Sequence, residues 1–312
     1  MSLRYYRAMS DPTESTNPET PAAGQGQQER LWTPWRMRYV GGGAKEEGCI
    51  FCNRLANADD AASLIVHREP DIFVIMNLFP YNTAHLMIVP TAHVESPETA
   101  PERALARLGT LLQPVTRALR RVLTCDGFNV GFNVGAVAGA GVAEHLHQHV
   151  VPRWTGDANF MPILAGTMVL PELIPASYAK VRAELRREML PPDAPHRDDV
   201  LVVATTNARD VLLQQDPSGL RLPRFRAGAE RPLWRVALQG VSRVVGEAEL
   251  IGWGGASSTL TDQVPVFRVL GREIVAGNDA GFVRVDRSDA VRLLAGDSDR
   301  AIAEAAFAFD PE

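Results

Sequence analysis

Three histidines alternate with other residues near the middle of the chain, at His145, His147 and His149. Side chains two positions apart on a β-strand point to the same face, so this spacing predicts a row of imidazole rings. Such a row makes a poor core face, because each buried imidazole needs a polar partner. We therefore expect these rings to serve catalysis or metal binding. The alternative is a histidine run exposed to solvent.

Two cysteines stand earlier in the chain, at Cys49 and Cys52. A CxxC pair either binds zinc through two thiolates or cycles between thiols and a disulfide. The redox form usually stands where a strand meets a helix in a thioredoxin-like unit, and that pattern is not seen here. A closed structural zinc site needs two further ligands. The odd total of three cysteines favours a reducing compartment over a disulfide framework.

The chain has 312 residues and a formal net charge of −5. This length accommodates two domains. The net charge provides no global basic field, so we expect no nucleic-acid partner. No apolar run approaches the roughly 20 residues that cross a bilayer, and the polar N-terminus has no signal-peptide core. We therefore predict a cytoplasmic protein without a membrane segment.

Changes in composition divide the chain into four regions. Residues 1–28 are rich in Pro, Thr, Glu, Gln and Gly, which is typical of a disordered tail. Residues 29–190 are predicted to form the first domain, residues 191–197 a proline-containing linker, and residues 198–312 a second, smaller α/β domain.

The first domain is predicted to be α+β, a small antiparallel sheet with helical cover. Its strands are expected at 64–67, 72–76, 85–89 and 128–134 and at the histidine segment, and its helices at about 101–123 and 171–190. Thr99 and Glu102 predict a capping box for the long helix. The arginines on the outer face of that helix are expected to be solvated: Arg107, Arg117, Arg120 and Arg121.

The second domain has strands predicted at 200–204, 211–213, 250–253, 264–270 and 282–285, and helices at 233–245, 288–294 and 298–308. This order resembles a Nudix fold. A Nudix enzyme needs a run of glutamates on one helix to hold magnesium near a pyrophosphate, and the helix at 233–245 has none. We therefore expect a non-catalytic domain that covers the active site or mediates assembly.

The segment His145-Leu146-His147-Gln148-His149-Val150-Val151 resembles the signature of the histidine-triad (HIT) superfamily, three histidines alternating with apolar residues, except at Gln148. Asn77, residues 85–90 and His93 resemble the nucleoside-binding half of that family. Residues 144–160 look like the bacterial diadenosine tetraphosphate phosphorylase branch. The resemblance covers about residues 30–190 and implies a HIT-like antiparallel sheet with helices.

The resemblance assigns chemistry to two of the histidines. A neutral imidazole can attack an α-phosphorus and carry the nucleotidyl group as a phosphoramidate. By resemblance His147 is the nucleophile, and His149 contacts the phosphoryl or bridging oxygens. The attacking nitrogen must be free while the other ring nitrogen donates its hydrogen, usually to a backbone carbonyl near the strand. His85 is expected to be structural, with hydrogen bonds inside the sheet.

Substrate contacts are expected around the triad. Asn77 resembles the residue that holds the ribose hydroxyls, and Asn133 is a candidate for a phosphate or ribose oxygen. The amides of Gly139 and Gly141 are candidates for phosphate binding, because glycine lets a phosphate approach the main chain. A plain β-turn is the alternative. Family members often carry a Ser or Gln in this turn, and the absence of such a side chain here puts one phosphate contact in doubt.

Two residues follow the triad strand, Arg153 and Trp154. In the phosphorylase branch this region approaches the substrate, so both are candidate substrate contacts. The Trp154 ring either stacks on a base or packs in the core. Asp157 is expected to shape the loop.

The resemblance also completes the metal site. His93 is the candidate third ligand, and His145 is the fourth by resemblance to zinc-bearing relatives such as galactose-1-phosphate uridylyltransferase. The expected cofactor is a structural zinc ion on Cys49, Cys52, His93 and His145. A site with no open position cannot activate water. Two buried free cysteines are the alternative.

The implied activity is that of a nucleotidyl hydrolase or transferase that cleaves dinucleoside polyphosphates, with an adenine dinucleotide as substrate and inorganic phosphate or water as acceptor. Three alternatives remain: hydrolysis of a nucleoside phosphoramidate or adenylylated compound, nucleotidyl transfer to a sugar phosphate, and non-catalytic nucleotide binding. An intact His147 favours an enzyme. Relatives commonly form dimers, so a homodimer is expected.

Overall fold

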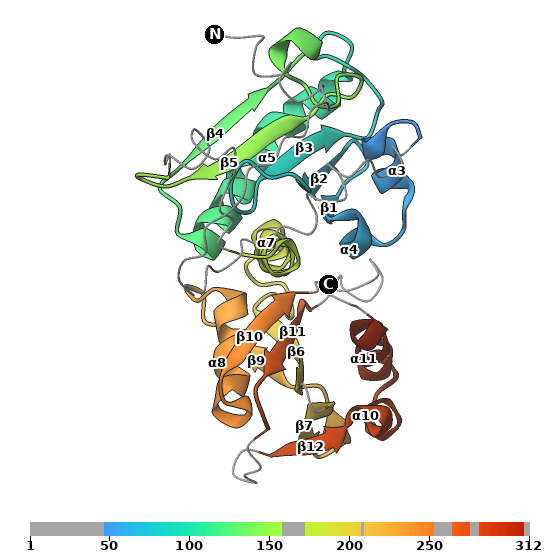
Figure 1. Cartoon of the computed structure of the whole chain (residues 1–312), viewed down its shortest axis with the longest axis vertical. Coiled ribbons are helices and arrows are strands. Elements are labelled where there is room, and N and C mark those ends of the chain that lie inside the picture. Colours follow the sequence, from blue (N-terminus) through green and yellow to red (C-terminus); the bar gives the residue numbers. More distant parts are fainter. Residues whose placement is uncertain (1–46, 158–171, 207–208, 253–263, 275–280, 309–312) are drawn as a thin grey trace, which may run out of the picture. The chain divides into compact units, whose positions relative to one another are not determined.

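The computed structural model of the chain describes residues 47–157, 172–206, 209–252, 264–274 and 281–308. The predicted tail at 1–28 lies outside these residues. Two β-sheets with helices on their faces make up the described chain (Figure 1), which confirms the α+β class and a second sheet-containing region. None of the described helices is both long enough and apolar enough to span a membrane.

The first sheet is antiparallel throughout, in the strand order β1-β2-β3-β5-β4. The strands are β1 Ile65–Arg68, β2 Ile72–Met76, β3 Leu86–Pro90, β4 Gly127–Phe132 and β5 Gln148–Arg153. Strands β2 and β3 are buried at every position because alternate residues enter two different apolar clusters. We expected β3 to end before Pro90, but a proline at the last ladder position forfeits only one donor and is tolerated there.

The long helix α5, Glu102–Leu123, supplies the apolar cluster on one face of this sheet. An apolar stripe of this helix faces the sheet, with Leu108, Val115 and Leu119 buried against β2 and β3. The predicted capping box is wrong. Pro101 is the N-cap without a side-chain bond, and the Thr99 hydroxyl donates to the Ser96 carbonyl oxygen at 3.2 Å.

The arginines of α5 are paired, which was not predicted, although Arg117 and Arg120 are exposed as expected. Arg107 makes a two-pronged contact with Glu69 at 2.6 Å. Arg117 and Arg121 reach the carboxylate of Glu188 on helix α7, Ile174–Met189, at 2.7 and 3.1 Å. Arg120 donates to the carbonyl oxygens of Cys125 and Asp126. The sequence could not reveal these partners, because most lie far away along the chain.

Helix α7 joins two apolar clusters. Its larger side chains enter the cluster beneath α5, and its alanines enter the cluster of the second sheet; these alanines are Ala176, Ala179 and Ala183. The small side chains permit close approach. A Cβ on Gly252 would lie 2.7 Å from the Pro175 carbonyl carbon, and Gly252 has a φ of +122°.

The second sheet has the order β10-β11-β6-β7-β12, with β9 paired to β6 and β8 to β7. Only the β11–β6 pair is parallel among the described strands. The strands are β6 Asp199–Thr206, β7 Asp210–Asp216, β8 Gly219–Arg221, β9 Arg224–Arg226, β10 Ala248–Gly252, β11 Val266–Gly271 and β12 Phe282–Asp286. Strands β8 and β9 were not predicted, since three residues carry too little periodicity.

Helix α8, Leu233–Val245, packs on one apolar cluster of this sheet, and helices α10, Arg287–Leu293, and α11, Asp297–Ala308, pack on another. All three match the predicted helices to within a residue. Residues 190–198 contain turns but no helix or strand, and the predicted linker falls here. The division into domains at this linker stays a prediction.

Candidate active site and metal centre

The three histidines stand at the start of β5, and only His149 belongs to the strand. The expectation that all three lie on one strand is therefore wrong. The preceding residues are anchored instead by the Leu146 amide, which donates to the Val94 carbonyl oxygen at 2.6 Å. His149 pairs with Met87 of β3, whose side chain faces away from α5. In this register the histidines lie on the face of the sheet that is opposite α5. On that face helix α3, Ile50–Ala56, contributes Phe51 to the apolar cluster.

Four thiol and imidazole groups converge at the edge of this face. The candidate ligand atoms of Cys49, Cys52, His93 and His145 lie within 4.8 Å of one another. The Cys49 sulfur is 3.3 Å from Nδ1 of His145, and the Cys52 sulfur is 3.4 Å from Nδ1 of His93. In a tetrahedral zinc site, neighbouring ligand atoms are about 3.3–3.8 Å apart. The two-sulfur, two-nitrogen donor set therefore fits zinc.

The orientation of His145 supports the same assignment. Its Nε2–H donates to the Pro90 carbonyl oxygen at 2.9 Å, which leaves the Nδ1 lone pair facing the cysteine sulfurs. Metal-bound histidines typically have the other ring nitrogen fixed in this way. Cys49 is the N-cap of α3, so the first turn of that helix brings Cys52 to the same side. Helix α3 was not predicted from the sequence.

His147 has one engaged and one free ring nitrogen. Its Nδ1–H donates to the His145 carbonyl oxygen at 2.8 Å, and Nε2 has no hydrogen-bond partner among the described residues. Phe51 packs on the ring with a centroid distance of 5.1 Å. Burial lowers the pKa of His147, so the ring is neutral at physiological pH. A neutral imidazole with a free Nε2 lone pair is a competent nucleophile.

A relay of hydrogen bonds orients His149. The Tyr81 amide donates to Nδ1 of His85 at 3.1 Å, so Nε2 of His85 carries the hydrogen. That Nε2–H donates to Nδ1 of His149 at 3.0 Å. Nε2 of His149 must then carry a hydrogen, and this buried atom has no partner among the described residues. The ring of His147 lies beside that of His149, with a centroid distance of 4.8 Å.

Both rings of this relay are held neutral. Burial, and then the neighbouring rings of His149 and His147, lower the pKa of His85 to about 3. Burial, and then His147, lower the pKa of His149 to about 4. His85 was expected to form hydrogen bonds inside the sheet, and it does; the sequence did not reveal that its partner is His149, 64 residues away. Tyr81 was missed too: its ring is 4.8 Å from that of His85, and it is 55% exposed.

Asn77 lies beside His85 and is engaged within the chain. Its amide Nδ2 is 3.2 Å from Nδ1 of His85, and its Oδ1 accepts the Phe79 N–H at 2.9 Å. Asn133 is half-buried beyond the end of β4, and no hydrogen bond joins it to the triad within the described residues. The ribose contact of Asn77 and the phosphate or ribose contact of Asn133 stay predictions.

The glycine turn begins with the short helix η1, Ala136–Ala138. Gly139 has a φ of +84°, which other residues rarely adopt, and a Cβ on Gly139 or Gly141 would meet nothing within 4 Å. Both glycines are thus free of close neighbours on the side where a side chain would stand. Phosphate binding by these amides stays a prediction.

Arg153 and Trp154 are organised around a carboxylate. Arg153 makes a two-pronged contact with Asp157 at 2.6 and 2.7 Å and donates to Asn129 at 2.6 Å. The Trp154 amide donates to the same Asp157 at 3.0 Å. Asp157 accordingly shapes the loop, as expected. Substrate contacts of Arg153 and Trp154 stay predictions.

Comparison with known proteins agrees with this geometry. The HIT domain family model matches residues 59–156. AP-4-A phosphorylase from Mycobacterium tuberculosis is 37% identical over 169 residues, which cover 52% of this chain and 87% of that protein. The chain belongs to the HIT family. The expected resemblance to the phosphorylase branch is thereby confirmed.

Two further relatives of the HIT domain are more distant. Adenylylsulfatase HINT3 from Arabidopsis thaliana is 26% identical over 112 residues, which cover 36% of this chain and 55% of that protein. A Zn-bound histidine triad family protein from Mycobacterium smegmatis has 27% identity and a TM-score of 0.37, over 44% of this chain and 93% of that one. The sequence likenesses support the expected class, a nucleotide-processing enzyme of the HIT family.

Proposed function

We propose that this HIT domain cleaves dinucleoside polyphosphates by transferring a nucleotidyl group first to His147 and then to phosphate or water. The supporting observation is the pair of opposite Nε2 atoms: a lone pair on His147 and an N–H on His149. One can attack phosphorus while the other donates to the phosphoryl oxygens. The 37% identity to AP-4-A phosphorylase supports an adenine dinucleotide as substrate.

In the first step Nε2 of His147 forms a bond to the α-phosphorus. The bond from that phosphorus to the bridging oxygen breaks, and the electron pair leaves with the nucleoside polyphosphate. The His147 ring gains positive charge, which the His145 carbonyl oxygen stabilises through Nδ1–H. The Nε2–H of His149 donates to the phosphoryl or bridging oxygens as their charge grows.

In the second step an oxygen of phosphate or water attacks the same phosphorus, and the bond to Nε2 of His147 breaks. The electron pair returns to the ring, which regains its neutral form; when water is the acceptor, it releases a proton to solvent. A zinc ion bound by Cys49, Cys52, His93 and His145 would supply structural support. It would hold in place the His145 carbonyl group, which accepts the hydrogen bond from His147.

The test is product analysis with diadenosine tetraphosphate, with and without inorganic phosphate. ATP plus ADP formed only with phosphate identifies a phosphorylase, and AMP plus ATP without a phosphate requirement identifies a hydrolase. His147→Ala should abolish either reaction. His196→Ala is the matched control, because His196 lies in the predicted linker at 191–197 and pairs with Asp199. Absence of any His147-dependent product would refute this proposal.

A second candidate is hydrolysis of an adenylylated compound, which the likeness to adenylylsulfatase HINT3 favours. It uses the same first step with a different leaving group and water as acceptor. Adenosine 5′-phosphosulfate and an adenosine phosphoramidate, offered beside diadenosine tetraphosphate, would rank the substrates by kcat/KM. If the protein binds nucleotides but turns over none of these compounds, the conclusion would be that it is a non-catalytic nucleotide-binding protein.

The expected homodimer is proposed as well. Strand β4 stands at the edge of the first sheet, paired only with β5 in the described chain. An edge strand offers unpaired backbone donors and acceptors to a second chain. Val130 on this strand is 44% exposed, which is unusual for a large apolar side chain in a sheet.

A further inference from the structure

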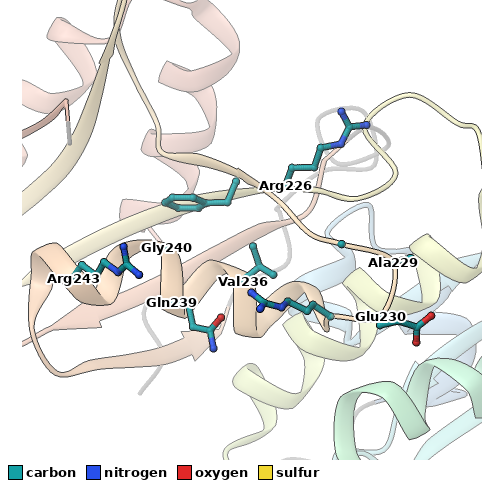
Figure 2. Close-up of a pocket in the computed structure, with 10 residues that line it drawn as sticks. Arg226, Ala229, Glu230, Val236, Gln239, Gly240 and Arg243 are labelled. Carbon is teal, nitrogen blue, oxygen red and sulfur yellow. The ribbon is translucent and has the colours of Figure 1, made fainter.

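A cleft of about 740 Å³ lies in the C-terminal part of the chain, beside α8 and β9 (Figure 2). This volume is in the range of sites for small ligands. Arg226 of β9 and Arg243 and Gln239 of α8 stand along it, and Glu230 lies in the loop that leads into α8. No residue of the HIT active site contributes to this cleft.

The charge of the cleft is opposite to that of the protein. Three guanidinium groups, from Arg226, Arg231 and Arg243, line it against the single carboxylate of Glu230, whereas the whole chain carries a net charge of −5. Arg226 has Asp199 at 3.5 Å. Arg231 and Arg243 have no ion-pair partner in the part of the chain that the structure describes. Two guanidinium groups are therefore available to an anion.

The cleft offers little to a metal ion. Helix α8 contains no aspartate or glutamate, and Glu230 is the only lining residue with a carboxylate. Magnesium sites that serve pyrophosphate chemistry need several carboxylate oxygens. A phosphate chain in this cleft would be held by arginines directly. Guanidinium groups suit this role because their planar donors match phosphate oxygens in pairs.

The walls of the cleft are held in place by the rest of the fold. The fully buried Arg187 of α7 donates to the carbonyl oxygens of Gly228, Ala229 and Arg231 at 3.0, 3.1 and 2.9 Å. A Cβ on Gly240 would lie 2.6 Å from the Phe225 ring, so the absence of a side chain lets this ring pack on α8. The loop that carries Arg231 is thus formed before any ligand arrives.

We propose that this cleft is a second binding site, for a compound with two or more linked phosphate groups. Arg231 and Arg243 provide the charge, and Phe225 provides an apolar part of the lining. The ligand is either a nucleoside polyphosphate or a free polyphosphate, since the linked phosphates are common to both. Binding needs no divalent cation.

The test is calorimetric titration of the full-length protein with tripolyphosphate in magnesium-free buffer. The Arg231→Ala/Arg243→Ala double variant should bind about 100-fold more weakly, because each charge-assisted contact is worth roughly a factor of ten. The control is Arg284→Ala/Arg292→Ala, which removes the same charge from exposed positions of the C-terminal part outside the cleft. Unchanged melting temperatures verify that both variants are folded.

Hydrogen exchange then separates this cleft from the HIT site. Tripolyphosphate should protect amides within 224–245 in the wild type and not in the cleft variant. Protection confined to residues 139–149, an equal loss of affinity in the control, or inorganic phosphate binding as tightly as tripolyphosphate would overturn the proposal. If ATP binds more tightly than tripolyphosphate, the site is assigned to nucleotides. If ATP and tripolyphosphate bind with equal affinity, the site is assigned to the phosphate chain.

Discussion

Nε2 of His85 lies 3.0 Å from Nδ1 of His149, and this contact decides which nitrogen of His149 carries the hydrogen that faces the active site. The Tyr81 amide occupies the other nitrogen of His85, so the donor direction along the relay is fixed. The ring that ends the relay is a donor, and the neighbouring His147 presents a lone pair. Two chemically identical side chains therefore have opposite roles because of their different hydrogen-bond partners.

His85 is thus a positioning residue. We expect His85→Ala to lower kcat by about 10- to 100-fold, since partners of this kind typically contribute that much when they orient a reacting ring. His85→Gln should recover part of the loss, because its amide can donate to Nδ1 of His149. Steady-state kinetics of both variants are the measurement. Equal activity of the Ala and Gln variants at equal thermal stability would mean that the contact is only structural.

The pKa values of the triad predict the acid limit of activity. Burial lowers the pKa of His147, and it lowers that of His149 to about 4. The reaction needs both rings neutral, so kcat should persist below pH 6.5, where an unperturbed histidine becomes protonated. The measurement is the pH dependence of single-turnover cleavage. An apparent pKa at or above 6.5 would contradict the burial of these rings.

The same burial predicts a loss of stability in acid. His85 has a folded-state pKa of about 3, below the ordinary value of about 6.5 in the unfolded chain. As the pH falls below 6.5, His85 becomes protonated in the unfolded chain and stays neutral in the folded chain. The free energy of unfolding therefore decreases, and it continues to decrease toward pH 3. Between pH 6.5 and 5 this costs about 2 kcal/mol for one histidine. Denaturant unfolding of wild type and His85→Gln should differ by that pH-dependent amount. Parallel pH profiles would exclude His85 as the source.

The cysteine cluster predicts one zinc ion per chain. Cys49→Ser and Cys52→Ser should each remove most of the metal and lower the melting temperature, because zinc affinity contributes directly to folding. Cys125→Ser is the matched control, since this buried cysteine lies outside the cluster. Metal analysis by mass spectrometry and thermal unfolding are the measurements. If Cys125→Ser loses zinc and the Cys49 and Cys52 variants keep it, the metal does not bind at this cluster.

The exposed edge of the first sheet predicts the site of self-association. Val130→Asp places a charge on edge strand β4 and should convert a dimer into a monomer. Val283→Asp is the matched control, because Val283 is 36% exposed on β12, the edge strand of the second sheet. Light scattering coupled to size exclusion reports the mass. A monomeric wild type, or a dimer that survives Val130→Asp, would rule out pairing through β4.

Residue types and their spacing were enough to identify the side chains that carry chemistry and the regular elements with strong periodicity. The alternation of His145, His147 and His149 and the CxxC pair are local signals, so they could be identified without a fold. Helix α8 was predicted at its observed bounds because its apolar residues recur with the helical period over more than three turns.

Which residues act together became clear from the folded chain and could not be predicted. Strand β3 lies between β2 and β5, which brings His85 beside His149 and the Pro90 carbonyl beside His145. The sulfur of Cys49 meets His145 across 96 residues of chain. Sequence spacing carries no record of such distances, because register between strands is fixed by packing of both sheet faces. The tautomers of the triad follow from that register, and with them the roles of His147 as lone-pair donor and of His149 as hydrogen-bond donor.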